Sequence, residues 1–147
     1  MKIFIGADHQ GFRLKNKLIE YLKKAGYSVK DSSNQRLNPE DDFPVFAAKV
    51  TNSILTSNDS DVRGILICGS GQGMNMAANR FRGIRACLGY DRDSVRLARN
   101  DDDSNVLCLP AHILDSDEAK IIVETWINTP FAGASRYIRR INELDKL

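Results

Sequence analysis

A cysteine and three alternating glycines lie together in the segment ILICGSGQGMNMAANRF, residues 65–81. Cys68 ends an apolar run, and Gly69, Gly71 and Gly73 lead into a helical pattern. Backbone N–H groups in a glycine-rich turn can point into one concavity, and a helix start adds a positive dipole end. Such a turn could bind a phosphate, a carboxylate or an enediolate oxygen. The alternative is a tight strand-to-helix turn whose glycines serve only close packing.

The thiol of Cys68 could act at this turn as a base or as a nucleophile. A thiol at a helix N-terminus has a lowered pKa, so more of it is thiolate near neutral pH. A nucleophile would want a histidine partner, and the chain has only His9 and His112. A base would need only the anion hole beside it. The residues alone leave both roles open, but the lack of a histidine–cysteine cluster argues against a structural metal site.

Two further groups of charged residues are candidates for a functional role. Asp8 and His9 follow a buried apolar strand, where an ionisable pair is costly unless it is paired or functional. The alternative for Asp8 is to cap the helix that begins near residue 11. Arg136 and Arg140 are four residues apart on one helical face, and two guanidinium groups suit a phosphate. The alternative for the arginines is a solvated tail.

Nucleotide-binding motifs do not account for the glycines. The segment GADHQG at residues 6–11 has the two-glycine spacing of a P-loop, but Phe12 and Arg13 follow where lysine and serine or threonine are needed. The segment GSGQGM lacks the spacing of the dinucleotide fingerprint and follows the third expected strand instead of the first. A nucleotide site is therefore not expected.

Short β runs alternate with amphipathic helices along the whole chain. The expected strands are residues 2–6, 27–31, 62–69, 83–89 and 104–110, and the expected helices are residues 13–26, 45–55, 73–79, 93–99, 116–127 and 135–147. This alternation predicts an α/β fold, a three-layer α/β/α sandwich with a five-stranded parallel Rossmann-like sheet and a C-terminal helix. Right-handed crossovers bring the carboxyl ends of parallel strands to one edge, where such folds bind ligands.

Composition indicates an ordinary globular protein of one domain, residues 1–147, with 42% apolar and 27% charged residues. Twenty-one basic residues against 19 acidic ones give a net charge of +2, which favours neither a nucleic acid nor a membrane surface as partner. No apolar run suggests a signal peptide or a membrane span, so we expect a cytoplasmic protein. The three cysteines contain no C-x-x-C pair and are expected to be buried free thiols.

Several segments together resemble the type B ribose-5-phosphate isomerases and the related galactose-6-phosphate and allose-6-phosphate isomerases. They are IGADHQGFRLK, DFP at residues 42–44, GILICGSGQGM, AANRFRGIRA, SNVLCLPA and TWINTPFAG, in the family's order along essentially the whole chain. The resemblance implies an aldose–ketose isomerase without metal or organic cofactor, in which a proton moves between C1 and C2 through a cis-enediolate. The expected reaction interconverts ribose 5-phosphate and ribulose 5-phosphate. The alternatives are the same chemistry on a hexose 6-phosphate and a non-catalytic sugar-phosphate binding protein.

The resemblance also implies a role for each residue of the first two groups. Cys68 corresponds to the base that carries the proton, and Ser70 to the residue that helps to position the reacting hydroxyls. The amides of residues 69–73, which include all three glycines, correspond to the anion hole for the enediolate. Asp8 and His9 correspond to a pair that binds the sugar and its phosphate.

The family builds each site across a dimer interface, so the resemblance implies a homodimer or a dimer of dimers. Arg136 and Arg140 correspond to its C-terminal phosphate arginines. Asp101 stands where the family has a histidine that opens the sugar ring, so Asp101 is either the ring-opening acid, a substrate-binding group or part of a solvated loop. The remaining departures are Asp102 for an asparagine, His112 for a phosphate-binding arginine, Tyr137 for a histidine and Phe43 for a tyrosine.

Overall fold

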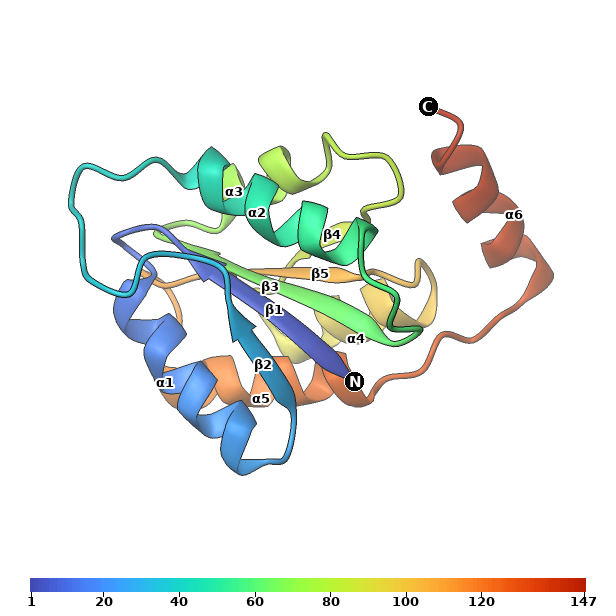
Figure 1. Cartoon of the computed structure of the whole chain (residues 1–147). Helices are drawn as coiled ribbons and strands as arrows, with labels where there is room; N and C mark the ends of the chain where they lie inside the picture. Colours follow the sequence, from blue (N-terminus) through green and yellow to red (C-terminus); the bar gives the residue numbers. More distant parts are fainter.

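The computed structural model describes residues 1–147 and contains one five-stranded sheet (Figure 1). The strands are β1 (Lys2–Ala7), β2 (Ser28–Asp31), β3 (Val62–Cys68), β4 (Ala86–Leu88) and β5 (Val106–Pro110). The helices are α1 (Phe12–Lys24), α2 (Phe43–Leu55), α3 (Gln72–Ala78), α4 (Arg92–Asn100), α5 (Ser116–Asn128) and α6 (Ser135–Leu144). The strand order is β2-β1-β3-β5-β4, and every pair of neighbours is parallel. The predicted α/β fold with a five-stranded parallel sheet is confirmed.

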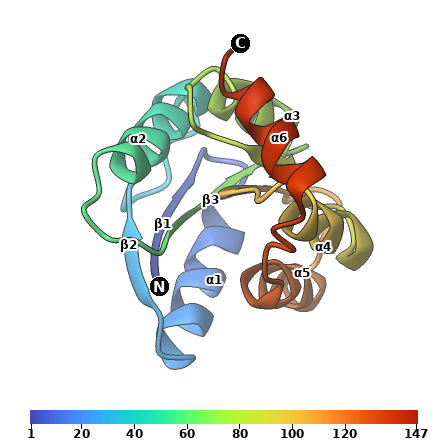
Figure 2. The same ribbon diagram turned by 90° about the vertical axis from the view of Figure 1, so that its right-hand side faces the viewer.

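Helices cover both faces of the sheet because alternate side chains of each strand point to opposite faces (Figure 2). In β3, Ile65 and Ile67 belong to the apolar cluster under α1, α4 and α5, whereas Leu66 belongs to the cluster under α2 and α3. Both faces of the central strand are thus buried, as its nearly continuous apolar sequence predicts. Helix α6 belongs to neither layer and has no buried residue.

The least accurate prediction concerns β4, which was expected over residues 83–89 and covers only Ala86–Leu88. Gly83 has a φ of 83°, which takes the backbone out of the extended conformation. The side chain of Asn105 then donates to the carbonyl of Gly83 at 2.8 Å and accepts from the amide of Arg85 at 2.8 Å. A side chain therefore replaces the ladder partner that the first residues of this run would need. The last helix also ends earlier than expected, at Leu144.

The sheet places three loops side by side at the carboxyl ends of its central strands. Ala7 is in register with Ile67, and Cys68 is in register with Pro110, so the residues that follow β1, β3 and β5 meet at one edge. The order in which successive strands are added to the sheet reverses at β1, because β2 lies on one side of β1 and β3 on the other. Ligands bind at such a switch point in open α/β sheets. None of the helices is both long and apolar enough to cross a membrane.

Candidate active site

Cys68 is the last residue of β3 and is only 5% exposed. Its carbonyl accepts a hydrogen bond from the amide of Ala111 at 2.9 Å, which joins the ends of β3 and β5. The turn that follows passes the exposed Ser70 and reaches Gly71, whose φ of 74° lies in the left-handed region. Helix α3 starts at the next residue, Gln72. The thiol therefore lies where a rigid strand gives way to a glycine turn.

The glycines of this turn allow polar groups to approach the backbone closely. A Cβ on Gly69 would lie 2.9 Å from Cε1 of His112 and 3.0 Å from Oε1 of Gln10. The amide of His112 donates to the carbonyl of Gly69 at 2.9 Å, which fixes the histidine beside the turn. A Cβ on Gly73 would lie 2.9 Å from the ring of Phe43. Close packing, the alternative considered for the glycines, is thus one of their roles, and the packing brings an imidazole to the turn.

Asp8 and His9 reach the same edge from β1. Asp8 is 6% exposed, and its Oδ1 accepts from the amides of Gln10 at 3.0 Å and Gly11 at 3.1 Å. It therefore closes the turn that leads into α1, close to the capping role considered as its alternative, although α1 itself begins after Gly11 without a side-chain cap. His9 is half-buried, and its Nδ1 lies 2.9 Å from Oδ1 of Asp41.

Asp41 is a residue of this edge that sequence reasoning missed. The hydrogen bond to Asp41 is the largest cause that raises the pKa of His9, and the charge of Asp8 acts in the same direction while burial opposes it. The two residues are 32 positions apart in the sequence: His9 follows β1, and Asp41 lies in a polar loop with no periodic pattern. Only the path of residues 32–42 over the end of β1 brings the two side chains together.

The remaining candidates lie at the other end of the sheet. Asp101 ends α4 and accepts from Nδ2 of Asn100 at 2.7 Å. Loss of solvation and then the charge of Asp101 raise the pKa of Asp102, whereas the positive charge of Arg140 lowers it. The charge of Asp101 in turn contributes to a raised pKa of Arg136, whose main cause is a hydrogen bond to Tyr137. Two carboxyl groups and two guanidinium groups therefore influence one another at this end.

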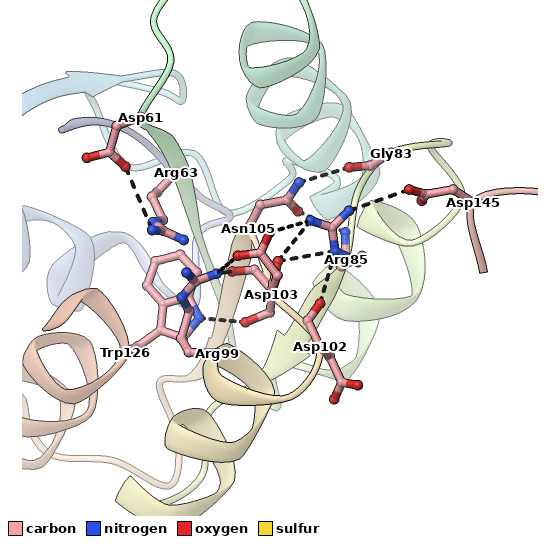
Figure 3. Close-up of polar contacts among 11 residues, drawn as sticks. Asp61, Arg63, Gly83, Arg85, Arg99, Asp102, Asp103, Asn105, Trp126 and Asp145 are labelled. Atoms are coloured by element: carbon pink, nitrogen blue, oxygen red, sulfur yellow. Dashed lines mark hydrogen bonds and ion pairs between the residues drawn. The ribbon is translucent and has the colours of Figure 1, made fainter. Parts of the chain in front are cut away.

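Arg85 connects the loop of residues 102–103 to the end of the chain after α6, as Figure 3 shows. Its Nε donates to the carbonyl of Asp102 at 3.0 Å, and its Nη2 donates to the carbonyl of Asp103 at 3.0 Å and to Oδ2 of Asp103 at 3.1 Å. Its Nη1 lies 3.8 Å from Oδ2 of Asp145, just after α6. Asp103 has a φ of 47°, and its Oδ1 accepts from Arg99 at 2.7 Å. Two arginines thus hold a strained residue and fix the loop that carries both candidate carboxyls.

The candidate residues around Cys68 and those around Asp101 do not meet within this chain. Cys68 lies at the carboxyl end of β3, and the loop of residues 101–103 lies before the amino end of β5. From Gly64, which pairs with the first residue of β5, the strand runs four residues to Cys68, a length of about 13 Å. Figure 1 shows α6 beyond the amino ends of the strands. The candidate residues therefore form two groups, one at each end of the sheet, and the chain has no group of three or more side chains arranged to bind a metal ion.

Comparison with known families gives one match over nearly the whole chain. Residues 3–144 match the model of a family described as ribose/galactose isomerase. The probable ribose-5-phosphate isomerase B of Mycoplasma genitalium is 38% identical, over 97% of this chain and 92% of the relative. Ribose-5-phosphate isomerase B of Mycobacterium tuberculosis is 33% identical, over 98% of this chain and 88% of the relative.

Solved structures give the same result. A ribose 5-phosphate isomerase from Thermotoga maritima has a TM-score of 0.93 and 42% identity, covering 99% of this chain and 98% of its own. The isomerase of Mycoplasma genitalium, solved with bound ribulose 5-phosphate, has a TM-score of 0.93 and 36% identity, covering 99% and 94%. The likeness extends to the C-terminal helix that stands apart from the sheet, because nearly the full length is matched.

Proposed function

The chain belongs to the ribose/galactose isomerase family, and we propose that Cys68 is the base with which it interconverts ribose 5-phosphate and ribulose 5-phosphate. The observation that carries the proposal is the position of the Cys68 thiol, at the end of a buried strand and directly before a glycine turn at the ligand-binding edge. Aldose–ketose isomerisation needs a base and donors for a developing oxyanion within a few ångströms of each other. This turn supplies both from consecutive residues.

The reaction at this edge moves one proton between carbon atoms and one between oxygen atoms. Cys68 as thiolate takes the proton from C2 of the open-chain aldose; the electron pair of the broken C–H bond forms the C1–C2 double bond, and the π pair of the C1 carbonyl moves to O1. The amides of residues 69–73 stabilise the negative oxygen of this enediolate. The proton of the O2 hydroxyl then passes to O1, the C2 carbonyl forms, and the thiol returns its proton to C1, which gives the ketose. Ser70, two residues after Cys68, is exposed and positions the sugar hydroxyls. Asp8 binds the sugar at the end of the neighbouring strand β1.

The substrate is a pentose phosphate. The relatives reported above are named for ribose 5-phosphate, and one of their structures holds ribulose 5-phosphate. His9 and His112 lie at the edge where Cys68 ends its strand, and we assign them to the substrate phosphate together with Arg136 and Arg140. The arginines lie at the far end of the same chain, so a second copy must provide them.

We infer that the protein works as a homodimer or a dimer of dimers in which opposite ends of two chains meet. Asp101, Asp102, Arg136 and Arg140 of one subunit then complete the site around Cys68 of the other. Helix α6 supports this arrangement, since it has no buried residue in its own chain and leaves exposed apolar side chains such as Ile138. All three cysteines are free, which fits one domain working in a reducing compartment such as the cytoplasm.

Deuterium exchange tests this function. The protein is incubated in heavy water with ribose 5-phosphate and, in parallel, with allose 6-phosphate and galactose 6-phosphate, and mass spectrometry follows deuterium at C1 and C2. We expect exchange and net isomerisation on the pentose, no exchange by Cys68→Ala and normal exchange by Cys87→Ala, whose thiol is in β4. Faster exchange on a hexose would move the substrate to that class. Exchange on none of the sugars would contradict the isomerase function.

A further inference from the structure

Asp41 contacts His9 twice through one oxygen. Its Oδ1 accepts from the backbone amide of His9 at 2.8 Å and lies 2.9 Å from the ring Nδ1. The side chain of Asp41 is only 7% exposed, whereas that of His9 is 31% exposed. A carboxylate can only accept hydrogen bonds, so Nδ1 must carry the hydrogen. The other ring nitrogen, Nε2, is then the one left for a ligand.

The second carboxylate oxygen of Asp41, which does not contact His9, also has a hydrogen-bond partner. Its Oδ2 accepts from Nδ2 of Asn34 at 3.1 Å. The carbonyl of Asn34 accepts from Nζ of Lys15 at 2.9 Å, and the same ammonium group pairs with Oδ2 of Asp31 at 2.7 Å. The Lys15 side chain is fully buried, which anchors this series of hydrogen bonds in α1. Both oxygens of Asp41 are therefore fixed, and the imidazole that they orient has little freedom to turn.

The neighbouring charges favour the imidazolium form of His9. Asp41 and Asp8 are the charged groups that face the ring, and both raise the pKa of His9, while burial lowers it. A raised histidine pKa keeps the positive charge to a higher pH. Such a charge strengthens a hydrogen bond from Nε2 to a phosphate oxygen.

We propose that Asp41 is a positioning residue for the isomerase reaction, one that accepts from Nδ1–H of the His9 imidazolium and so directs its Nε2–H toward the phosphate of the sugar. This inference rests on the proposed function, because the phosphate is that of the isomerase substrate. It also gives Asp41 a role that a sequence pattern could not assign, since Asp41 and Asp42 are adjacent aspartates in a polar loop. Only Asp41 faces the histidine.

The first test needs no variant and no substrate. The chain has two histidines, so nitrogen-15 NMR resolves both imidazoles, and His112 serves as an internal reference. In the neutral form of the wild-type protein we expect hydrogen on Nδ1 of His9 and a bare Nε2. Hydrogen on Nε2 with a bare Nδ1 would overturn the proposal. Because this readout contains no sugar, it is independent of whether Cys68 catalyses isomerisation.

The second test compares Asp41→Asn with Asp42→Asn, a matched control whose position begins α2 without a side-chain cap hydrogen bond. We expect Asp41→Asn to lower the pKa of His9 and to raise KM for ribose 5-phosphate roughly ten-fold near neutral pH, with kcat little changed. The difference in KM should shrink as the pH falls and both proteins become protonated at His9. A merely structural role would leave the His9 titration where it is in the wild type, and that result would contradict the proposal.

Discussion

At the scale of single residues, the three thiols of this chain occupy very different surroundings. Burial raises the pKa of Cys87 to about 11 and raises that of Cys108 well above its ordinary value. Cys108 is fully buried in the central part of β5, whereas Cys87 is only half-buried, less covered than the sequence predicts. Both thiols therefore stay protonated near neutral pH, and only Cys68 ends its strand at the edge where we propose that the substrate binds.

Removal of the Cys68 thiol should abolish most of the chemistry. We expect Cys68→Ala to lower kcat by roughly 10² to 10⁴, the usual contribution of a positioned general base, with little change in KM. Cys87→Ala is the control and should keep its kcat. Steady-state kinetics on ribose 5-phosphate provide the measurement, and activity of Cys68→Ala within a few-fold of wild type would exclude the base assignment.

The carboxyls of Asp101 and Asp102 compete for the role of ring-opening acid. A donor must hold its proton near neutral pH, and Asp102 is the one whose pKa is raised, by loss of solvation and by its neighbour. Sequence position made Asp101 one candidate for the role, beside a substrate-binding role and a solvated loop, because it stands where the family has a histidine. Sequence could not show how solvation is divided between two consecutive aspartates, since that depends on how Arg85 holds their loop.

Parallel assays of Asp101→Asn and Asp102→Asn separate these roles. Each variant is assayed on ribose 5-phosphate and on a tetrose 4-phosphate, which cannot close a furanose ring. We expect Asp102→Asn to lose activity on the cyclic pentose only, and the wild-type rate on the pentose to fall as pH rises through the raised pKa, since the acid form is the donor. An equal loss on both sugars would indicate a binding role, and no loss would assign the loop to solvent.

At the scale of elements, the turn between β3 and α3 passes through a glycine whose backbone conformation and close neighbours disfavour any side chain. Gly71 has a φ of 74°, and a Cβ there would lie 2.5 Å from Cδ1 of Leu88 and 3.2 Å from the backbone nitrogen of Pro110. Gly133 has a similar φ of 64°, but a Cβ there would have no neighbouring atom within 4 Å. The two positions therefore share backbone strain and differ in the room for a side chain.

Alanine at both positions separates strain from steric conflict. We expect Gly133→Ala to lower the free energy of unfolding by about 1 kcal/mol and Gly71→Ala by about 2–4 kcal/mol, because overpacking adds to the left-handed conformation. Chemical denaturation measures both. Gly71→Ala should also lower kcat, because the backbone amides of the turn move. Equal destabilisation of the two variants would mean that the β3–α3 turn yields without cost.

Helix α6 carries Arg136 and Arg140, the arginines proposed to bind the phosphate, and none of its residues is buried by its own chain. We expect Arg136→Ala and Arg140→Ala each to raise KM for ribose 5-phosphate by at least about ten-fold, since each removes a charged donor to the phosphate. Arg139 is the matched control, because it lies on the same helix and pairs only with Glu143, at 3.8 Å. If all three variants bind substrate alike, the helix is a solvated tail, the alternative that the spacing left open.

The elements differ in how far the sequence could predict them. Strand β3 and the leucines of α1 follow the periodicities of buried elements, and both were predicted closely. Strand β4 was not, because a tertiary contact decides it: the side chain of Asn105 replaces the first ladder bonds of β4. Helix α2 begins two residues earlier than expected, at Phe43, with Pro44 in its first turn, where proline is tolerated. The residues of the Cys68 edge follow from chain topology, whereas the Asp41–His9 contact depends on a loop with no pattern.

At the scale of the whole molecule, the two groups of candidate residues lie at opposite ends of one rigid sheet. The end of α6 meets the body through Nε of Arg82, which donates to the carbonyl of Asp145 at 2.6 Å. A hollow of about 650 Å³ remains between α6 and residues 79–84. Arg82 and Arg85 both contact Asp145, just after the helix, whereas no residue of α6 itself is buried. We propose that each active site combines the Cys68 end of one subunit with the α6 end of another.

Complementation between two impaired variants tests that claim most directly. Cys68→Ala and Arg140→Ala chains with different affinity tags are co-expressed, and the doubly tagged assembly is assayed at ribose 5-phosphate concentrations below KM. If the sites are shared, one site in each mixed dimer receives both lesions and the other receives none, so we expect roughly half of the wild-type activity. Activity no higher than that of the two separate variants would contradict the account, because it would mean that each chain builds its site alone.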